Sequence, residues 1–319
     1  MGVSGDATGR PAPRRVAVLG AGLMGSQIGV EYALGGWTVE WIVRDRTRGE
    51  SRVEAALALA REHGLAEPED AAAARERMVW SRCGDRPNMP VDVIVESLTE
   101  DLELKAELLG ELAAQHPRAV LASNTSSISI TALGRAAGAE DRMVGAHYWN
   151  PPLLMPLVEV VGAEKTGADV RARVVEILRG LGKRPVVLRR EVPGLLWNRL
   201  QLAVLRESLW LVEQGVADPA TIDEVMRDGL ARRWRLTGPF ETVALGGAPT
   251  FDAIAENLFP VLSDMSDAGG GFGPHAPKDP EVLAELRRRR DRALGAELST
   301  EQGATARDPS GPQRHRTKP

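Results

Sequence analysis

The feature that most limits how this chain can fold is a glycine-rich turn that directly follows a short apolar run. Residues 15–19 (RVAVL) predict a buried strand, and GAGLMG at 20–25 follows without a break. In G-x-G-x-x-G the first glycine permits a tight turn, the second lets backbone approach a pyrophosphate, and the third allows a helix to pack closely on the strand. A second predicted strand covers 37–43, with Asp45 just beyond it. This order of strand, turn, helix, strand and acid predicts a dinucleotide-binding Rossmann unit.

The acid beyond the second predicted strand indicates which dinucleotide is bound. Asp45 is expected to accept hydrogen bonds from the adenosine ribose hydroxyls and to repel a 2′-phosphate, which favours NAD over NADP. Arg44, Arg46 and Arg48 flank it, and their positive charges soften that preference. Amides at the start of the helix face the phosphates. The expected cofactor is therefore NAD, bound by Gly20, Gly22, Leu23, Met24, Gly25 and Asp45.

Polar residues follow two later predicted strands at the point where each strand ends. The strand at 91–95 leads into Glu96–Glu100, and the strand at 119–122 leads into Ser123–Ser127. Ligands of doubly wound folds bind at the carboxyl ends of the strands. Glu100, with Lys105 on the following helix, is thus a candidate for cofactor contact, although a helix-start acid and a solvated lysine are the default interpretations. The small polar run either hydrogen-bonds a substrate oxygen or caps the next helix.

The strongest candidate for the chemistry lies between two predicted strands, at 143–146 and 157–161. Asn150-Pro151-Pro152 between them forbids a regular element. His147 ends the first strand, and Glu159 lies inside the second. If the strands run side by side, the carboxylate fixes the imidazole tautomer and raises the basicity of the other ring nitrogen, which makes a general base. A buried pair that only joins two strands is the alternative, since structural pairs also perturb pKa values.

After Pro193-Gly194 the sequence predicts helices and no further strands, so this dipeptide marks a domain boundary. Asn198 heads an otherwise apolar helix face near this junction. If it is buried there it must find partners, either backbone groups or a substrate together with His147. The expected organisation is disorder at 1–13, an α/β Rossmann-type dinucleotide-binding domain at 14–191, an all-α C-terminal domain at 192–298 and a disordered tail at 299–319.

Composition excludes several classes of partner. The formal net charge is −4 with a pI of about 5.9, and the basic run at 287–290 stands alone, so nucleic-acid binding is not expected. Cys83 is the only cysteine, which excludes an intrachain disulfide and a metal cluster built on thiolates. No apolar run is long enough to span a bilayer, and the N-terminus lacks the apolar core of a signal peptide. We expect a cytoplasmic protein with no membrane partner and no metal.

Besides GAGLMG, the chain contains the motifs ESLTEDLELK at 96–105, SNTSS at 123–127, HYWNPP at 147–152, PLVEVV at 156–161, PGLLWNRL at 193–200 and GPFE at 238–241. With these motifs in this order, the chain resembles the 3-hydroxyacyl-CoA dehydrogenase family over nearly all of 14–295. Within that family it is most similar to the branch that contains L-gulonate 3-dehydrogenase, also called lambda-crystallin, through EDLELK, WNPP followed by PLVE, NRLQ and GPFET.

The resemblance implies a reversible NAD-dependent oxidation, in which the 3-hydroxyl of an L-3-hydroxy acid or 3-hydroxyacyl substrate becomes the 3-keto group. It implies that His147 is the general base, that Glu159 orients it, and that Ser126 and Asn198 hold the substrate oxygens. The family usually places its active site in the cleft between the domains and forms homodimers through the helical domain. The implied NAD contacts are Gly20, Gly22, Gly25, Asp45, Glu100 and Lys105.

One departure from the family pattern bears on the substrate. Acyl-CoA members resemble each other in a lysine pair before glycine that meets the CoA phosphates, whereas this chain reads Arg61-Glu62-His63-Gly64. A carboxylate at a phosphate site lowers affinity by like-charge repulsion, so a free acid is favoured over a CoA thioester. Arg233 lies where the gulonate branch also has an arginine, and a guanidinium binds a carboxylate bidentately. We hypothesise that Arg233 recognises the substrate carboxylate.

Three alternatives have different consequences for the site. The nearest is 3-hydroxyacyl-CoA dehydrogenase activity proper. A β-hydroxyacid dehydrogenase of the hydroxyisobutyrate type shares the glycine motif but uses a lysine on the helix after the domain boundary, where this chain has Asn198 and no lysine between Lys183 and Lys278. The third is a non-catalytic NAD-binding structural or sensor protein, and the set Ser126, His147, Glu159 and Asn198 argues against it.

Overall fold

The computed structural model describes residues 14–82, 90–266 and 271–307. The chain divides into two compact units. The first unit comprises Met1–Leu195 together with Leu286–Pro319, and the second comprises Leu196–Glu285. Cys83, the expected disorder at 1–13 and the end of the expected tail, 308–319, lie outside the described residues.

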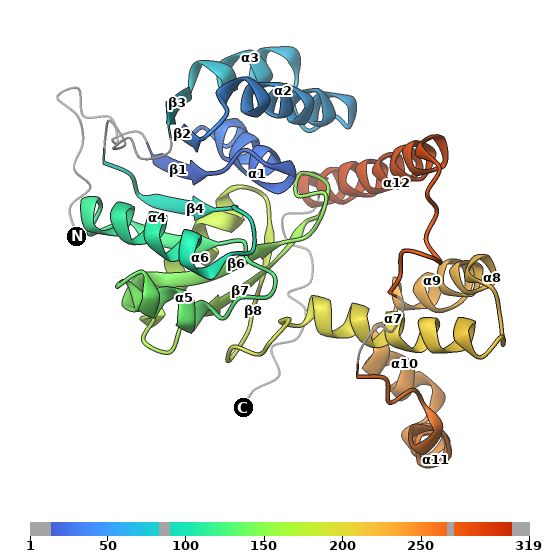
Figure 1. Cartoon of the computed structure of the whole chain (residues 1–319). Helices are drawn as coiled ribbons and strands as arrows, with labels where there is room; N and C mark the ends of the chain where they lie inside the picture. Colours follow the sequence, from blue (N-terminus) through green and yellow to red (C-terminus); the bar gives the residue numbers. More distant parts are fainter. Residues whose placement is uncertain (1–13, 83–89, 267–270, 308–319) are drawn as a thin grey trace. The chain divides into compact units, whose positions relative to one another are not determined.

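The first unit is built on an eight-stranded sheet with the order β3-β2-β1-β4-β5-β6-β7-β8 (Figure 1). Neighbouring strands run parallel except β6 and β7, which are antiparallel. The predicted Rossmann-type fold class is thereby confirmed. The strands are β1 (Arg15–Leu19), β2 (Thr38–Val43), β3 (Met78–Arg82), β4 (Val93–Glu96), β5 (Val120–Ser123), β6 (Met143–Tyr148), β7 (Leu157–Gly162) and β8 (Arg184–Val187).

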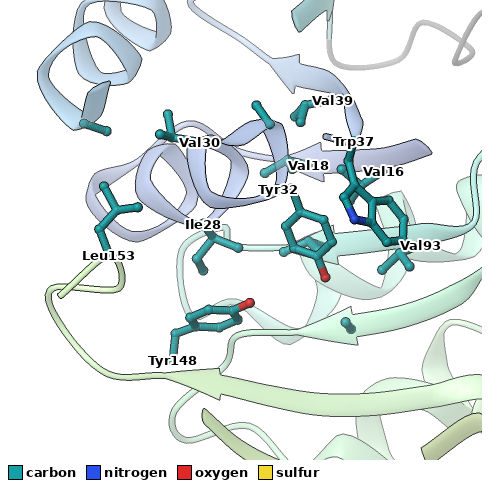
Figure 2. Packing of buried hydrophobic residues seen from close by; sticks show 14 of the residues in the cluster. Val16, Val18, Ile28, Val30, Tyr32, Trp37, Val39, Val93, Tyr148 and Leu153 are labelled. Carbon is teal, nitrogen blue, oxygen red and sulfur yellow. The ribbon is translucent and has the colours of Figure 1, made fainter. Parts of the chain in front are cut away.

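Alternation along the strands divides the core into two layers, one on each face of the sheet. Val16 and Val18 point to the layer that also holds Ile28 and Tyr32, and Figure 2 shows these side chains packed together. Ala17 and Leu19 of the same strand join the opposite layer. The first layer is covered by α1 (Leu23–Leu34), α2 (Arg46–Glu62), α3 (Pro68–Glu76) and α6 (Ala168–Gly180), and the second by α4 (Leu102–Gln115) and α5 (Ile130–Ala136). A single helical turn, η1 (Glu140–Arg142), precedes β6.

The second unit contains only helices among its described residues, which agrees with the all-α expectation. The apolar helix face that was expected to begin at Asn198 includes Leu202 and Leu209; Leu209 is buried, whereas Leu202 is 53% exposed. The helices are α7 (Trp197–Glu213), α8 (Pro219–Glu224), the π-helical turn η2 (Val225–Leu230), α9 (Ala231–Trp234), α10 (Pro239–Gly246), α11 (Ala248–Leu258) and η3 (Phe259–Val261).

The C-terminal helix differs from the expectation at its end. We expected disorder from 299, but α12 (Pro280–Arg307) continues to Arg307, and its part from Leu286 onward belongs to the first unit. Although the sequence of this helix is mostly charged, one small residue and one apolar residue in it are packed. Gly295 packs against the ring of His63, and a Cβ added to Gly295 would lie 2.3 Å from His63 Nδ1. Leu298 is buried. No helix among the described residues is long and apolar enough to cross a membrane.

Candidate active site

The glycine turn has the geometry that its sequence predicts. Gly20 adopts φ +91°, which favours glycine, and an added Cβ would lie 2.8 Å from the carbonyl oxygen of Ser97. A Cβ on Gly25 would lie 2.1 Å from the carbonyl oxygen of Gly20, so helix α1 packs directly on the turn. Among the described residues, the only atom within 4 Å of such a Cβ at Gly22 is Arg52 Nη1, at 3.8 Å. The N-terminus of α1 therefore has space in front of its amides, which fits a pyrophosphate.

The remaining predicted cofactor residues of this region surround that N-terminus. Leu23 is 62% exposed at the first position of α1, and Met24 is half-buried beside it. Asp45 is exposed and forms the N-cap of α2, where its Oδ1 accepts a hydrogen bond from the amide of Arg48 at 3.0 Å. The carboxylate thus has a structural partner already, in addition to the ribose hydroxyls that the sequence predicts for it.

His147 and Glu159 are brought together by the register of the two antiparallel strands. The two residues are Cα partners in the β6–β7 ladder, and the His147 Nδ1 lies 2.8 Å from Glu159 Oε2. Both side chains are buried, with 6% of His147 and 1% of Glu159 exposed. Trp149 Nε1 donates to the same carboxylate oxygen at 3.4 Å. A carboxylate at Nδ1 favours the tautomer with its proton there and leaves Nε2 as the basic nitrogen.

The connection after His147 is held by a buried cation that sequence reasoning missed. Lys183 Nζ donates to the carbonyl oxygens of Pro152 and Met155, at 2.6 and 3.0 Å, and forms an ion pair with Glu31 of α1 at 2.7 Å. Burial raises the pKa of the Glu31 carboxyl, and the Lys183 ammonium opposes that shift. The hydroxyl of Tyr148 donates to Glu31 at 3.4 Å. The segment that follows His147 is therefore fixed to the helix that begins at the glycine turn.

A second missed group lies where β4 and β5 end. The Glu96 carboxylate is fully buried, and it accepts from Lys105 Nζ at 2.6 Å, from the amide of Leu98 at 2.6 Å and from the hydroxyl of Ser123. Lys105 is itself only 1% exposed. Its default interpretation as a solvated lysine is wrong, because the buried carboxylate draws the ammonium inside. The cofactor contact expected for Lys105 stays a prediction.

The Glu100 carboxylate accepts hydrogen bonds from the hydroxyl-rich segment that follows β5. It accepts from Thr125 Oγ1 at 2.8 Å and from the amide and hydroxyl of Ser126 at 2.7 and 2.9 Å, and it forms an ion pair with Lys105 at 3.2 Å. Burial alone would raise the pKa of the Glu100 carboxyl, but the Ser126 amide, the Thr125 hydroxyl and the Lys105 charge outweigh it and lower the pKa to about 2. Three predicted site residues, Glu100, Lys105 and Ser126, therefore meet in one cluster.

Two predicted substrate residues belong to the second unit. Asn198 is the second residue of α7 and is half-buried, and Arg233 is an exposed residue of α9. The carbonyl oxygen of Arg233 accepts from the amides of Leu236 and Thr237, which ends this helical segment. The roles expected for Asn198 and Arg233 stay predictions.

Comparisons with known proteins give matches over both units of the chain. Residues 15–192 match the 3-hydroxyacyl-CoA dehydrogenase NAD-binding domain, and residues 194–278 match the C-terminal domain of the same family. An L-carnitine dehydrogenase of Streptomyces coelicolor is 36% identical over 73% of this chain and 74% of its own length. A 5-formyl-3-hydroxy-2-methylpyridine 4-carboxylate 5-dehydrogenase of Mesorhizobium japonicum is 31% identical over 80% of this chain and 82% of its own length.

Solved structures show the same relationship. The crystal structure of a 5-formyl-3-hydroxy-2-methylpyridine 4-carboxylic acid 5-dehydrogenase, described as an NAD⁺-dependent dismutase, superimposes with a TM-score of 0.81 at 27% identity and covers 91% of this chain and 99% of its own. The (S)-3-hydroxybutyryl-CoA dehydrogenase of Ralstonia eutropha has a TM-score of 0.62 at 29% identity and covers 69% of this chain and 78% of its own. The likeness thus extends to enzymes named for free acids and to enzymes named for CoA thioesters.

Proposed function

This chain belongs to the 3-hydroxyacyl-CoA dehydrogenase family, and we propose that its substrate is a free L-3-hydroxy acid rather than a CoA thioester. The protein is an NAD-dependent oxidoreductase that acts on a CH–OH group. The residues present fit the cofactor, because the N-terminus of α1 has open space at Gly22 and Asp45 is exposed beyond β2. When bound, the nicotinamide supplies the hydride acceptor.

The observation that carries the proposed mechanism is the contact of 2.8 Å between His147 and Glu159. His147 Nε2 takes the proton of the substrate hydroxyl as hydride leaves the same carbon. Glu159 keeps the ring in the tautomer with its proton on Nδ1 and stabilises the imidazolium that forms. Its own position is supported by the indole N–H of Trp149. In the reverse direction the imidazolium returns the proton to the carbonyl oxygen.

We assign the substrate oxygens to Ser126 and Asn198. The Ser126 hydroxyl donates to Glu100, whose lowered pKa keeps it ionised at neutral pH. Because the single proton of the substrate hydroxyl goes to His147, the substrate oxygen needs a donor, and the Ser126 hydroxyl supplies one when it rotates from Glu100 to the substrate. The Asn198 amide supplies a donor of the kind that a developing carbonyl oxygen needs.

The preference for a free acid rests on the end of α2. The helix ends at Glu62 with His63 as its C-cap, and the segment from Arg61 to Gly64 contains no lysine. Gly295 of α12 packs on the His63 ring, so part of this surface is covered within the first unit. The two curated relatives described above are named for carnitine and a pyridine carboxylate. A site for CoA phosphates at this helix end has little support.

For the carboxylate of the substrate we propose Arg233. A guanidinium matches a carboxylate with two parallel hydrogen bonds, whereas lysine offers a single point charge. Both Arg233→Ala and Arg233→Lys are expected to lower kcat/KM for the free acid by tenfold or more, with unchanged NADH affinity. Unchanged kcat/KM in both variants would dismiss the assignment.

We further propose that the second unit mediates homodimerisation in the cytoplasm, where NAD-dependent metabolism supplies the cofactor. Its described residues leave large apolar side chains uncovered, including Phe240 at 89%, Leu245 at 78% and Phe259 at 73% exposed. Surfaces of this kind are typical of subunit interfaces. Light scattering of the purified chain tests the oligomeric state, and cell fractionation tests the location.

A substrate panel tests the proposed function directly. NADH formation is followed with L-carnitine, L-gulonate, L-3-hydroxybutyrate and L-3-hydroxybutyryl-CoA, each at the same NAD⁺ concentration. We expect the highest kcat/KM with one of the free acids. The panel includes L-gulonate because the chain is similar to the gulonate branch. A highest value with the thioester would establish the alternative, a 3-hydroxyacyl-CoA dehydrogenase proper. NADH binding without turnover of any hydroxy substrate would favour a non-catalytic role.

A further inference from the structure

The border of the cofactor site carries a dense group of arginines that NAD alone does not require. Residues 44–52 contain four arginines against Asp45 and Glu50, and Arg82 adds a fifth. The five positive and two negative charges leave this small region with a net charge of +3, whereas the whole chain has −4. We call Arg44, Arg46, Arg48, Arg52 and Arg82 the arginine cluster.

The topology places the arginine cluster beside the glycine turn. Arg44 follows the last residue of β2, and Arg82 is the last residue of β3, where it is the Cα partner of Val43. The amide of Gly20 donates to the carbonyl oxygen of Ile42 at 3.0 Å, so the end of β2 lies against the turn. Arg52 reaches the turn itself, since its Nη1 donates to the carbonyl oxygen of Ala21 at 3.4 Å. The cluster therefore borders the predicted position of the adenosine ribose and the phosphates.

The negative charge of Asp45, which would repel a 2′-phosphate, is partly neutralised by the groups around it. The Asp45 carboxylate caps α2 and accepts from the amide of Arg48, so the positive end of the helix partly neutralises it. Arg44 and Arg46 adjoin Asp45 in sequence, and the side chains of Arg44, Arg46 and Arg48 are all exposed. Arg46 pairs with Glu50 at 2.7 Å, but both side chains are largely solvent-exposed, and such pairs on a helix surface contribute little. The exposed Arg44 and Arg48 side chains can therefore turn toward an anion, and Arg46 can exchange its surface pair with Glu50 for the same anion.

We propose that this enzyme also uses NADP⁺, and that Arg44, Arg46 and Arg48 bind the 2′-phosphate of its adenosine. Guanidinium groups bind phosphate oxygens with two parallel hydrogen bonds, and an arginine near the ribose is the usual way in which Rossmann folds accommodate a 2′-phosphate. The reaction balances as with NAD⁺: the substrate loses a hydride to nicotinamide C4 and a proton to His147, and NADPH and the ketone are formed. The cofactor preference then depends on the arginine cluster, not on Asp45 alone.

The test is a binding measurement that needs no knowledge of the hydroxy substrate. NADH and NADPH are titrated onto the full chain and followed by nicotinamide fluorescence. We expect the two dissociation constants to agree within about tenfold, with a steeper dependence on ionic strength for NADPH, because it carries additional negative charge. Adenosine 2′,5′-bisphosphate is expected to displace NADH more effectively than 5′-AMP.

Variants separate a specific phosphate site from general positive charge. The triple variant Arg44→Ala, Arg46→Ala, Arg48→Ala is expected to weaken NADPH binding tenfold or more and NADH binding less than threefold. Arg61→Ala is the matched control, because it removes another exposed arginine of α2 outside the arginine cluster, and both affinities should be unchanged. The proposal is overturned if wild-type protein binds NADPH a hundredfold more weakly than NADH, or if the triple variant weakens both cofactors equally. Either result leaves the proposed oxidation of a free hydroxy acid standing.

Discussion

Glu159 and His147 are direct partners across an antiparallel strand pair, and the carboxylate lies 2.8 Å from the Nδ1 atom of the ring. Because side chains alternate along a strand, a slip of one residue in this register would turn the two groups to opposite faces of the sheet. The buried ladder on both sides of the pair prevents such a slip, since Val158 and Val160 next to Glu159 are fully buried. The β6–β7 ladder thus sets the geometry of the proposed base.

Removal of the imidazole should abolish most of the turnover without loss of cofactor binding. General-base catalysis contributes about 10²–10⁴-fold, so we expect His147→Gln to lower kcat by roughly that factor. Glutamine keeps a similar polar volume in a nearly buried position. NADH titration of the same preparation is the control, and its dissociation constant should match the wild type. Wild-type turnover in this variant would remove His147 from the mechanism.

Loss of the charge behind the ring should have a smaller but substantial effect. Glu159→Gln keeps an acceptor for the Nδ1 proton but no longer stabilises the imidazolium, so we expect kcat to fall on the order of 10²-fold. Trp149→Phe is a matched comparison, because it removes the indole donor, 3.4 Å from the carboxylate, and keeps the carboxylate charge. That variant should lose less than tenfold. Equal losses in the two variants would mean that packing, and not the carboxylate charge, matters here.

The ionisation of Glu100 predicts how stability changes in acid. Its pKa is lowered from the ordinary glutamate value of 4.5 to about 2 in the folded chain. A lowered carboxyl pKa stabilises the folded state above the unfolded pKa, and this contribution is lost as pH falls from about 4.5 toward 2. The Glu100→Gln variant should therefore be less stable than the wild type at pH 7, with a difference that shrinks between pH 5 and pH 3. Urea denaturation at a series of pH values measures this, and a constant difference would contradict it.

The extent to which the sequence predicts this structure depends on how far apart the interacting residues lie. The glycine turn and the His147–Glu159 pair are encoded by short motifs with clear periodicity, so their local arrangement could be anticipated. Lys105 could not be placed in the same way, because an amphipathic helix predicts a solvated lysine unless its buried partner Glu96 is known. Ion pairs between distant segments leave no periodic signal at all.

Other differences have the same origin. The pair of Lys183 with Glu31 joins the residue before β8 to the first helix, and nothing in either local pattern indicates it. The chain from Ser299 onward was expected to be disordered because it is polar and contains proline and glycine, yet α12 continues to Arg307, beyond the packed residues Gly295 and Leu298. Leu202 lies on the apolar helix face that was predicted after Asn198 and is nevertheless 53% exposed. Amphipathic spacing identifies a face that seeks a partner, but it does not identify the partner.

The buried ion pair of Lys183 and Glu31 should be costly to break from one side only. Lys183→Met leaves the Glu31 carboxylate without its cation and the carbonyl oxygens of Pro152 and Met155 without their donor. We expect a loss of roughly 3–5 kcal/mol in the free energy of unfolding. The double variant Lys183→Met, Glu31→Gln should recover part of this loss, because no unpaired charge is then buried. Chemical denaturation of the two single variants and the double variant measures the coupling, and strictly additive losses would contradict it.

The two glycines at the start of α1 should separate cofactor binding from folding. In the part of the chain that the structure describes, a methyl group on Gly22 meets nothing closer than 3.8 Å, and the Gly22 backbone has φ −72°, so Gly22→Ala should fold with wild-type stability. The same methyl group occupies the space in front of the α1 amides, where a pyrophosphate has to approach, so NADH affinity should fall at least tenfold.

Gly25→Ala places its methyl group 2.1 Å from the carbonyl oxygen of Gly20 and forces α1 away from the turn. We expect it to lower stability by at least about 1–3 kcal/mol, the usual cost of overpacking. Thermal denaturation and NADH titration of both variants test the distinction, and normal NADH affinity in Gly22→Ala would move the cofactor phosphates away from this turn.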